Sequence, residues 1–330
     1  MSRIKYSRTL VLILLAVVLL VWFLWVNPFG WSDGKLSGEQ LAACGRPDTL
    51  VIDTYYNSID IEQVSSLSQV EAELVGDVGQ SADKLTVSST ANAVTVKVPK
   101  TGIFENGSIW GLNRRKLVIR IPSDLTLESL KVISRSGSID LYAIKASEIT
   151  AESTSGSVSY EALEAKFIRL SSVSGSISGG SAKASDDLKL TSTSGSVKGD
   201  DILASSFAAT SASGSVAFGS IEAETVELCS VSGSVKCESL LAKSLDARST
   251  SGSVIIEKLD FASKANLGST SGSVKIGLVS GEDMKLTGTS LSGSVNVNGE
   301  RYSKSFEKLY GNGTRTLETH STSSSVTINW

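Results

Sequence analysis

The sequence predicts an all-β protein: a single-chain parallel β-solenoid, a three-sided β-helix with 19–21 residues per coil, preceded by one transmembrane helix. Two observations predict the solenoid: a short motif recurs at a nearly constant interval, and apolar residues alternate between its copies. A third, an apolar stretch near the N-terminus, predicts the helix. The 330 residues are 41% hydrophobic with a formal net charge of −3, which is typical of a folded chain and gives no electrostatic reason to expect nucleic acid as a partner.

The recurring motif is Ser-Gly-Ser followed by Val or Ile. Its glycine is found at Gly137, Gly156, Gly175, Gly195, Gly214, Gly233, Gly252, Gly272 and Gly293, in steps of 19, 20 or 21 residues. An altered copy covers residues 323–326. A period of this length indicates one supersecondary unit per repeat, with each unit stacked on its neighbours.

Apolar residues within one period follow a regular rhythm. In the second unit they fall on Val158, Tyr160, Leu163, Ala165, Ile168, Leu170, Val173, Gly175 and Ile177. A step of two residues is the alternation of a strand, and a step of three marks a corner. Three corners per period predict a three-sided coil with its longest strand through Val173–Ile177. The extra residue of the 20-residue units falls at the second corner.

The same alternation predicts which residues of the motif face inward. Thr154, Gly156 and Val158 share one parity, so the glycines should form a structural column where opposite walls approach closely. The serines beside each glycine should point outward in two columns, with about 4.8 Å from coil to coil. This candidate contact face consists of Ser155, Ser157, Ser174, Ser176, Ser194, Ser196, Ser213, Ser215, Ser232, Ser234, Ser251 and Ser253.

The first 47 residues predict a membrane anchor. Residues 1–9, with three basic side chains, read as a short cytoplasmic N-terminus, residues 10–26 as the transmembrane helix, and residues 27–47 as a juxtamembrane linker. The β-domain is therefore expected outside the cytoplasm, on a single-pass protein of the cell membrane. Two alternatives remain open at this point: a cleaved signal peptide, and lipidation of Cys44, which follows Leu41-Ala-Ala.

The rest of the chain divides by the regularity of its pattern. Residues 48–122 show strand-like runs with loose periodicity and predict an N-terminal β cap of irregular coils. Residues 123–298 predict the regular solenoid repeats. Residues 299–330 combine an insertion with a final strand and predict a C-terminal lid.

Residues that could carry catalysis are few. The single histidine, His320, has no Cys, Asp or Glu at metal-ligand spacing, and the outward acidic residues are scattered over different sides. Cys237 should be a buried free thiol and Cys229 an exposed one, facing opposite ways and unable to pair. We therefore expect no catalytic residue, no metal and no cofactor, and a protein that is not an enzyme.

Two segments resemble a known family. The run Lys116–Leu130, which leads into the repeats, and the earlier run Thr54–Ile61 resemble the bacterial DUF4097 family, often labelled putative adhesin. The resemblance spans about residues 48–330. It implies a β-solenoid of the cell envelope, often membrane-anchored, with no established catalytic residues.

Together these patterns predict a non-enzymatic, membrane-anchored extracytoplasmic β-solenoid that acts by surface contact, as an adhesin-like module or a cell-envelope scaffold. Its expected partners are the membrane, through the N-terminal helix, and an envelope glycan or another envelope protein. The alternatives are an accessory or sensor protein of an envelope-stress signalling system and, less favoured, a polysaccharide-degrading β-helix enzyme.

Overall fold

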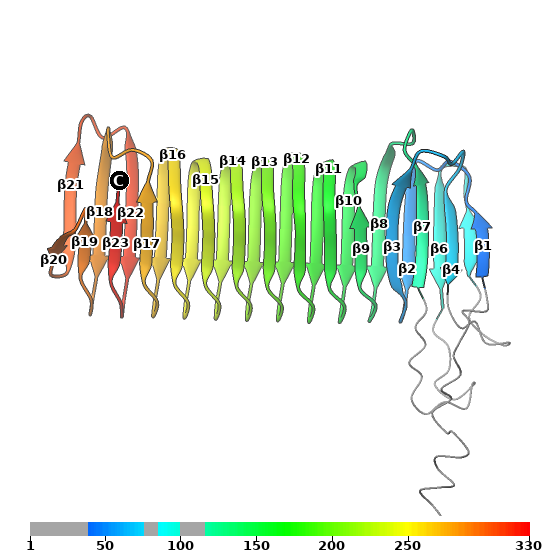
Figure 1. Ribbon diagram of the computed structural model, residues 1–330, viewed down its shortest axis with the longest axis horizontal. Coiled ribbons are helices and arrows are strands. Elements are labelled where there is room, and N and C mark those ends of the chain that lie inside the picture. The colour runs from blue at the N-terminus through cyan, green and yellow to red at the C-terminus, as the bar shows by residue number, and fades with distance from the viewer. Residues whose placement is uncertain (1–38, 76–84, 100–115) are drawn as a thin grey trace, which may run out of the picture. The chain divides into compact units, whose positions relative to one another are not determined.

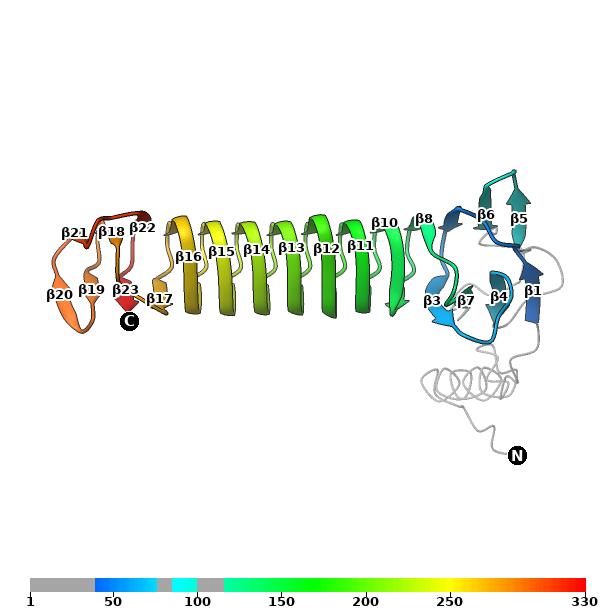
Figure 2. The same cartoon turned by 90° about the horizontal axis from the view of Figure 1, so that it is seen from above.

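The computed structural model describes residues 39–75, 85–99 and 116–330, all within one unit of the chain, residues 38–330. The predicted cytoplasmic N-terminus, transmembrane helix and signal peptide lie outside the described residues. Among the residues that are described, none forms a helix long and apolar enough to cross a membrane. The described secondary structure is all β, and its 23 strands join in one hydrogen-bonded sheet system (Figures 1 and 2).

The middle of the unit is a stack of parallel coils (Figure 1). One coil runs from the Val or Ile after one Ser-Gly-Ser to the end of the next. The strands of the successive coils in the stack are β10 (Ile144–Ser153), β11 (Val158–Ser172), β12 (Ile177–Ser192), β13 (Val197–Ser211), β14 (Val216–Ser230), β15 (Val235–Ser249) and β16 (Val254–Ser269). Each pairs in parallel with the next along the chain. The predicted parallel stack is confirmed.

Pairing within each coil comes in three runs. Between β13 and β14 the runs begin at Val197, Asp201 and Ser206, and they are separated by single unpaired residues. The 20-residue units place their extra residue at the second interruption, as the register shift beyond Ala184 shows. Because the backbone at a corner makes no ladder bonds to lose, an insertion there leaves the stacking of the other runs intact.

The core consists of like side chains stacked on one another. One inward column contains Leu163, Ala182, Ile202, Ile221, Leu240 and Leu259, all 3% exposed or less. Burying one large aliphatic side chain stabilises a fold by about 1.5 to 3 kcal/mol, so columns of this kind hold the stack together.

One inward column departs from this uniformity. Tyr160, Gly179, Gly199 and Phe218 succeed one another in it. A methyl group on Gly179 would lie 2.4 Å from the Tyr160 ring, and one on Gly199 would lie 3.0 Å from the Phe218 ring. The two aromatic side chains thus occupy the space that the two glycines leave, which is how an interior of small residues accommodates two large ones.

The third corner differs from its prediction. β11 ends at Ser172 and β12 begins at Ile177, so the motif between them is a tight turn, and the long strand predicted through Val173–Ile177 is wrong. Val173 is 49% exposed, whereas Ser172 before it is buried. Thr154 likewise faces solvent and Ser153 the interior. The hydroxyl of the inward serine makes this turn possible, as described below.

The N-terminal end is formed by nine strands. They are β1 (Glu39–Ala43), β2 (Thr49–Thr54), β3 (Ser58–Val64), β4 (Glu71–Val75), β5 (Thr86–Ser89), β6 (Ala93–Val98), β7 (Lys116–Pro122), β8 (Leu127–Ser134) and β9 (Ile139–Tyr142). β2 lies between β6 and β8, and β3 lies between β7 and β9. The β2–β3 coil is therefore enclosed within the stack. β4 pairs antiparallel with β7, β5 with β6, and β1 with β4. Because β1 belongs to the fold, the linker predicted over residues 27–47 is wrong for residues 39–47.

The C-terminal end repeats this arrangement. β22 (Arg315–Ser321) lies between β16 and β18 (Met284–Ser290), and β23 (Val326–Asn329) lies between β17 (Val274–Leu278) and β19 (Val295–Val297). β20 (Glu300–Tyr302) and β21 (Ser305–Tyr310) pair antiparallel with β19 and β18 at the outer edge (Figure 1). Only residues 300–310 thus cover the end, and the predicted final strand belongs to an inner coil.

Candidate functional site

The nine motif glycines form a column in the turn, where each approaches the backbone of an adjacent coil, so the expected approach of opposite walls at these glycines is wrong. A methyl group built on Gly214 would lie 2.3 Å from the carbonyl oxygen of Gly195 in the preceding coil. Across the nine glycines the corresponding distance to a backbone oxygen is 1.8–2.5 Å. No side chain fits at that separation, so glycine is required here by the close approach of successive coils.

Inward serines support this column, and the sequence analysis did not identify them. They precede each motif glycine by three residues: Ser134, Ser153, Ser172, Ser192, Ser211, Ser230, Ser249, Ser269 and Ser290, with Ser321 in the altered copy. The Ser211 hydroxyl accepts a hydrogen bond from the Gly214 backbone N–H at 2.8 Å and donates one to the Gly195 carbonyl at 2.8 Å. From Ser153 onward every inward serine makes both bonds.

The predicted contact face has two columns with different environments. The serine before each glycine is exposed: Ser155, Ser174, Ser194, Ser213, Ser232 and Ser251. The serine after each glycine is half-buried: Ser157, Ser176, Ser196, Ser215, Ser234 and Ser253. The hydroxyl of Ser176 accepts a bond from the Ser196 backbone N–H at 3.2 Å, so this second column partly serves the turn itself. The exposed surface combines the first serine column with Thr154, Val173, Thr193, Val231 and Thr250, and Ala212 beside them is half-buried.

The three cysteines are free thiols. Cys237 is buried as predicted, and desolvation raises the pKa of its thiol to about 12. Cys229 is half-buried, and burial, followed by the nearby Glu227 carboxylate, raises the pKa of its thiol. Cys44 is buried, its N–H donates to Val70, and desolvation raises its pKa to about 11.

These environments predict selective labelling. In the native full chain at pH 8, a water-soluble disulfide reagent should modify Cys229 alone, because the raised pKa and burial of Cys44 and Cys237 keep those thiols protonated and inaccessible. Denaturation should expose all three thiols. Mass spectrometry of tryptic fragments checks the positions, and native modification of Cys237 would contradict the inward placement of its strand.

The remaining candidates do not assemble into a reactive centre. Within residues 39–75, 85–99 and 116–330, no three His, Cys, Asp or Glu side chains gather closely enough to hold a metal ion. His320 is exposed, and its imidazole lies where a side chain on Gly268 would otherwise stand. Arg135 forms an ion pair with Asp53 at 2.9 Å and lies over the Tyr55 ring, at the junction between the inserted first coil and the repeats.

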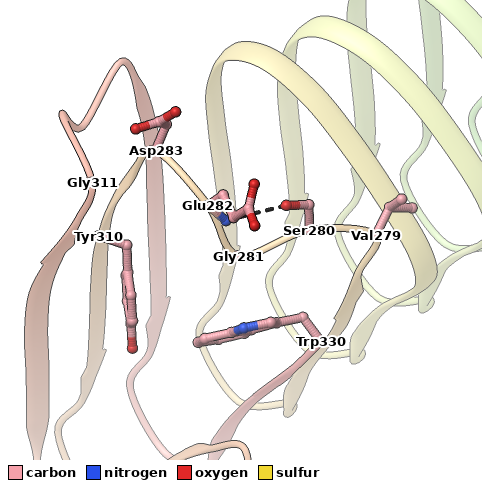
Figure 3. Close-up of a pocket in the computed structure, with 8 residues that line it drawn as sticks. All are labelled: Val279, Ser280, Gly281, Glu282, Asp283, Tyr310, Gly311 and Trp330. Carbon is pink, nitrogen blue, oxygen red and sulfur yellow. Dashed lines mark hydrogen bonds between the residues drawn. The ribbon is translucent and has the colours of Figure 1, made fainter.

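A pocket of about 650 Å³ near the C-terminal end is lined by two aromatic side chains and two carboxylates (Figure 3). Its lining comprises Val279, Ser280, Gly281, Glu282, Asp283, Tyr310, Gly311 and Trp330. The Tyr310 and Trp330 rings meet edge to face, with centroids 5.4 Å apart. In Figure 3 the Tyr310 ring stands on one side, the chain from Ser280 to Glu282 on the other, and the indole of Trp330 below.

Hydrogen bonds that involve backbone groups hold the walls of this pocket in place. The Arg315 guanidinium donates to the backbone carbonyls of Ser280 at 3.2 Å, Glu282 at 2.7 Å and Phe261 at 3.1 Å. The backbone N–H of Trp330 donates to the side-chain oxygen Oδ1 of Asn298 at 3.0 Å. These residues come from segments far apart in sequence, brought together by the insertion of β22 and β23, so no local motif could have indicated the pocket.

Stacked parallel coils, joined by one repeated turn, define a repetitive β-solenoid protein. The Toastrack DUF4097 family model matches residues 48–186 and 168–329, and the chain belongs to this family. The resemblance of Lys116–Leu130 and Thr54–Ile61 to that family is thereby confirmed. No curated protein matches the chain.

Several crystal structures are similar to this chain at low identity. A putative adhesin from Bacteroides fragilis is 12% identical, with 91% of this chain and 100% of that chain covered and a TM-score of 0.44. A putative adhesin from Parabacteroides distasonis is 12% identical, covering 90% and 98%, with a TM-score of 0.41. A putative cell adhesion protein from Clostridium sporogenes is 8% identical, covering 88% and 98%, with a TM-score of 0.21.

Proposed function

We propose that this protein is a non-enzymatic, adhesin-like module that acts by surface contact, held at the cell membrane by residues 10–26 with its β-solenoid outside the cytoplasm. Family membership and the repetitive β-solenoid support the adhesin-like part. The apolar stretch of residues 10–26, with basic residues before it, supports the anchor. Its partner would be an envelope glycan or another envelope protein.

The observation that carries this proposal is the repetition of one exposed chemistry from coil to coil. The corner presents a hydroxyl at Ser174, Ser194, Ser213 and Ser232, each on a turn anchored by an inward serine. A rigid array loses little conformational entropy on contact, and many weak hydrogen bonds add up when they engage one extended partner.

The test is a binding assay with the full chain reconstituted in liposomes and mixed with bacterial cells or isolated cell-wall glycan. Removing three adjacent hydroxyls, by Ser194→Ala, Ser213→Ala and Ser232→Ala together, should lower retention of the liposomes at least fivefold. The matched control changes three serines on a different side of the coils: Ser181→Ala, Ser220→Ala and Ser239→Ala. Those serines share one register column of paired strand residues, in which Asp201 lies between Ser181 and Ser220.

Equal retention of liposomes carrying either triple variant would show that the exposed serine column does not take part in the contact. Failure of the unaltered chain to bind either cells or glycan would defeat the adhesin-like proposal and favour the accessory or sensor role. In that case the membrane-embedded chain should instead co-purify with a second membrane protein through its short N-terminal end.

A further inference from the structure

We propose that the pocket between residues 279–283 and β21 binds one neutral pyranose residue of a glycan, an inference that rests on the proposed contact function and assigns its ligand class. The pocket offers aromatic surface, hydrogen-bond acceptors and a preformed shape, which is the usual composition of a small-ligand site.

The aromatic walls provide the apolar part of recognition. Trp330 remains 41% exposed, and Tyr310 is half-buried beside it. Ring faces carry negative electrostatic potential, which attracts the weakly positive C–H groups on the flat side of a pyranose ring. Gly281 packs on the indole of Trp330 and the Lys308 ammonium lies over the Tyr310 ring, so a sugar would cover the apolar surface that these groups leave facing water.

The polar groups distinguish a sugar from other ligands. Glu282 is exposed, and its carboxylate can accept hydrogen bonds from sugar hydroxyls. The Ser280 hydroxyl accepts from the Glu282 backbone N–H at 3.2 Å and keeps its own proton to donate (Figure 3). Asp283 already accepts a hydrogen bond from the Asn312 N–H on one carboxylate oxygen, at 3.0 Å, which leaves its other oxygen and the Glu282 carboxylate to accept bonds from a ligand.

Charge excludes the two nearest alternatives. An acidic sugar would meet the carboxylates of Glu282 and Asp283, which repel it. A cationic ligand would favour the same carboxylates, but the Lys308 ammonium already lies over the Tyr310 ring, 4.8 Å from its centroid. A second cation at this ring would be opposed by a like charge, so an uncharged sugar fits the pocket best.

The site is also preformed. The Arg315 side chain is only 14% exposed and fixes the chain at Ser280 and Glu282 through two carbonyls. A methyl group on Gly281 would lie 2.4 Å from the indole of Trp330, so the ring packs directly on the glycine backbone. Rigid walls of this kind reduce the entropy lost on binding.

The test measures binding of three methyl β-glycosides, those of glucose, N-acetylglucosamine and glucuronic acid, to the full chain in detergent. Saturation-transfer NMR detects the binding, and calorimetric titration gives its strength. At least one neutral glycoside should bind, and glucuronide should bind at least tenfold more weakly. Tyr310→Ala and Glu282→Gln should each weaken binding at least fivefold. Gly281→Ala, which displaces the indole, should abolish it.

Matched controls are Tyr142→Ala and Glu224→Gln, an exposed tyrosine and an exposed glutamate away from this pocket. Both should bind as the unaltered chain does, and circular dichroism should show all variants folded. Unchanged binding in folded Glu282→Gln and Tyr310→Ala, preferred binding of glucuronide or of tetramethylammonium, or no binding of any neutral glycoside would each overturn the proposal. If the unaltered chain binds cells but no neutral glycoside, only this inference fails. If it binds a glycoside in this pocket while both serine triple variants are retained equally by cells, only the serine-column contact fails.

Discussion

Gly214→Ala should lower the free energy of unfolding by about 3 kcal/mol, at the upper end of the range for overpacked interiors. The new methyl group would lie 2.3 Å from the Gly195 carbonyl oxygen and 2.4 Å from its carbon. Both are backbone atoms of the preceding coil, and the carbonyl oxygen accepts a hydrogen bond from the Ser211 hydroxyl. Neither atom can therefore rotate away as a side chain would. Gly214 does not have a left-handed φ, so the loss reflects the collision alone.

Thermal unfolding of the full chain, followed by circular dichroism, measures this effect. The midpoint should fall by several degrees, because a loss of 1 kcal/mol lowers the melting temperature of a domain this large by about 2 to 4 °C. Ser213→Ala, on the exposed neighbour of the same turn, is the control and should leave the midpoint within a degree or so. An unchanged midpoint for Gly214→Ala would show that successive coils do not approach closely at this column.

Ser211→Ala should destabilise the protein by about 2 kcal/mol, because it removes one hydroxyl and leaves two half-buried backbone groups without that partner. Those groups are the Gly214 N–H and the Gly195 carbonyl, each 2.8 Å from the hydroxyl oxygen. The change removes almost no volume, so packing contributes little to the loss. Denaturation midpoints in urea measure it.

Ser211→Thr keeps the hydroxyl and adds a methyl group, so it tests whether the hydroxyl itself stabilises the turn. Thr54 occupies the equivalent position in the β2–β3 coil, where its hydroxyl donates to the Asn57 carbonyl at 3.3 Å. The threonine variant should therefore be more stable than the alanine variant. If Ser211→Ala were as stable as Ser213→Ala, the inward serines would contribute nothing to the turn.

Periodicity predicted the fold well but misplaced one corner by a single residue. The step of three from Leu170 to Val173 looked like the other corners, because Val173 and Val231 are apolar. The structure exposes both and buries Ser172 and Ser230 instead. A signal was present: the residue three before each glycine is always serine, while the next varies among Thr, Val, Ala, Arg and Leu. Invariance marks the constrained inward position, even where the side chain is polar.

The sequence alone determined the parallel stacked coils, their length, the corner that takes an extra residue and the inward glycines. These follow from local repetition, because a residue type that recurs every 19 or 20 positions must meet the same surroundings in every coil. Only the tertiary structure decided the order of coils at the two ends and the pocket of Tyr310 and Trp330. At the C-terminal end the chain returns between earlier coils, and at the N-terminal end later strands flank the β2–β3 coil on both sides. The contacts therefore join segments that share no period, and nothing local in the sequence records them.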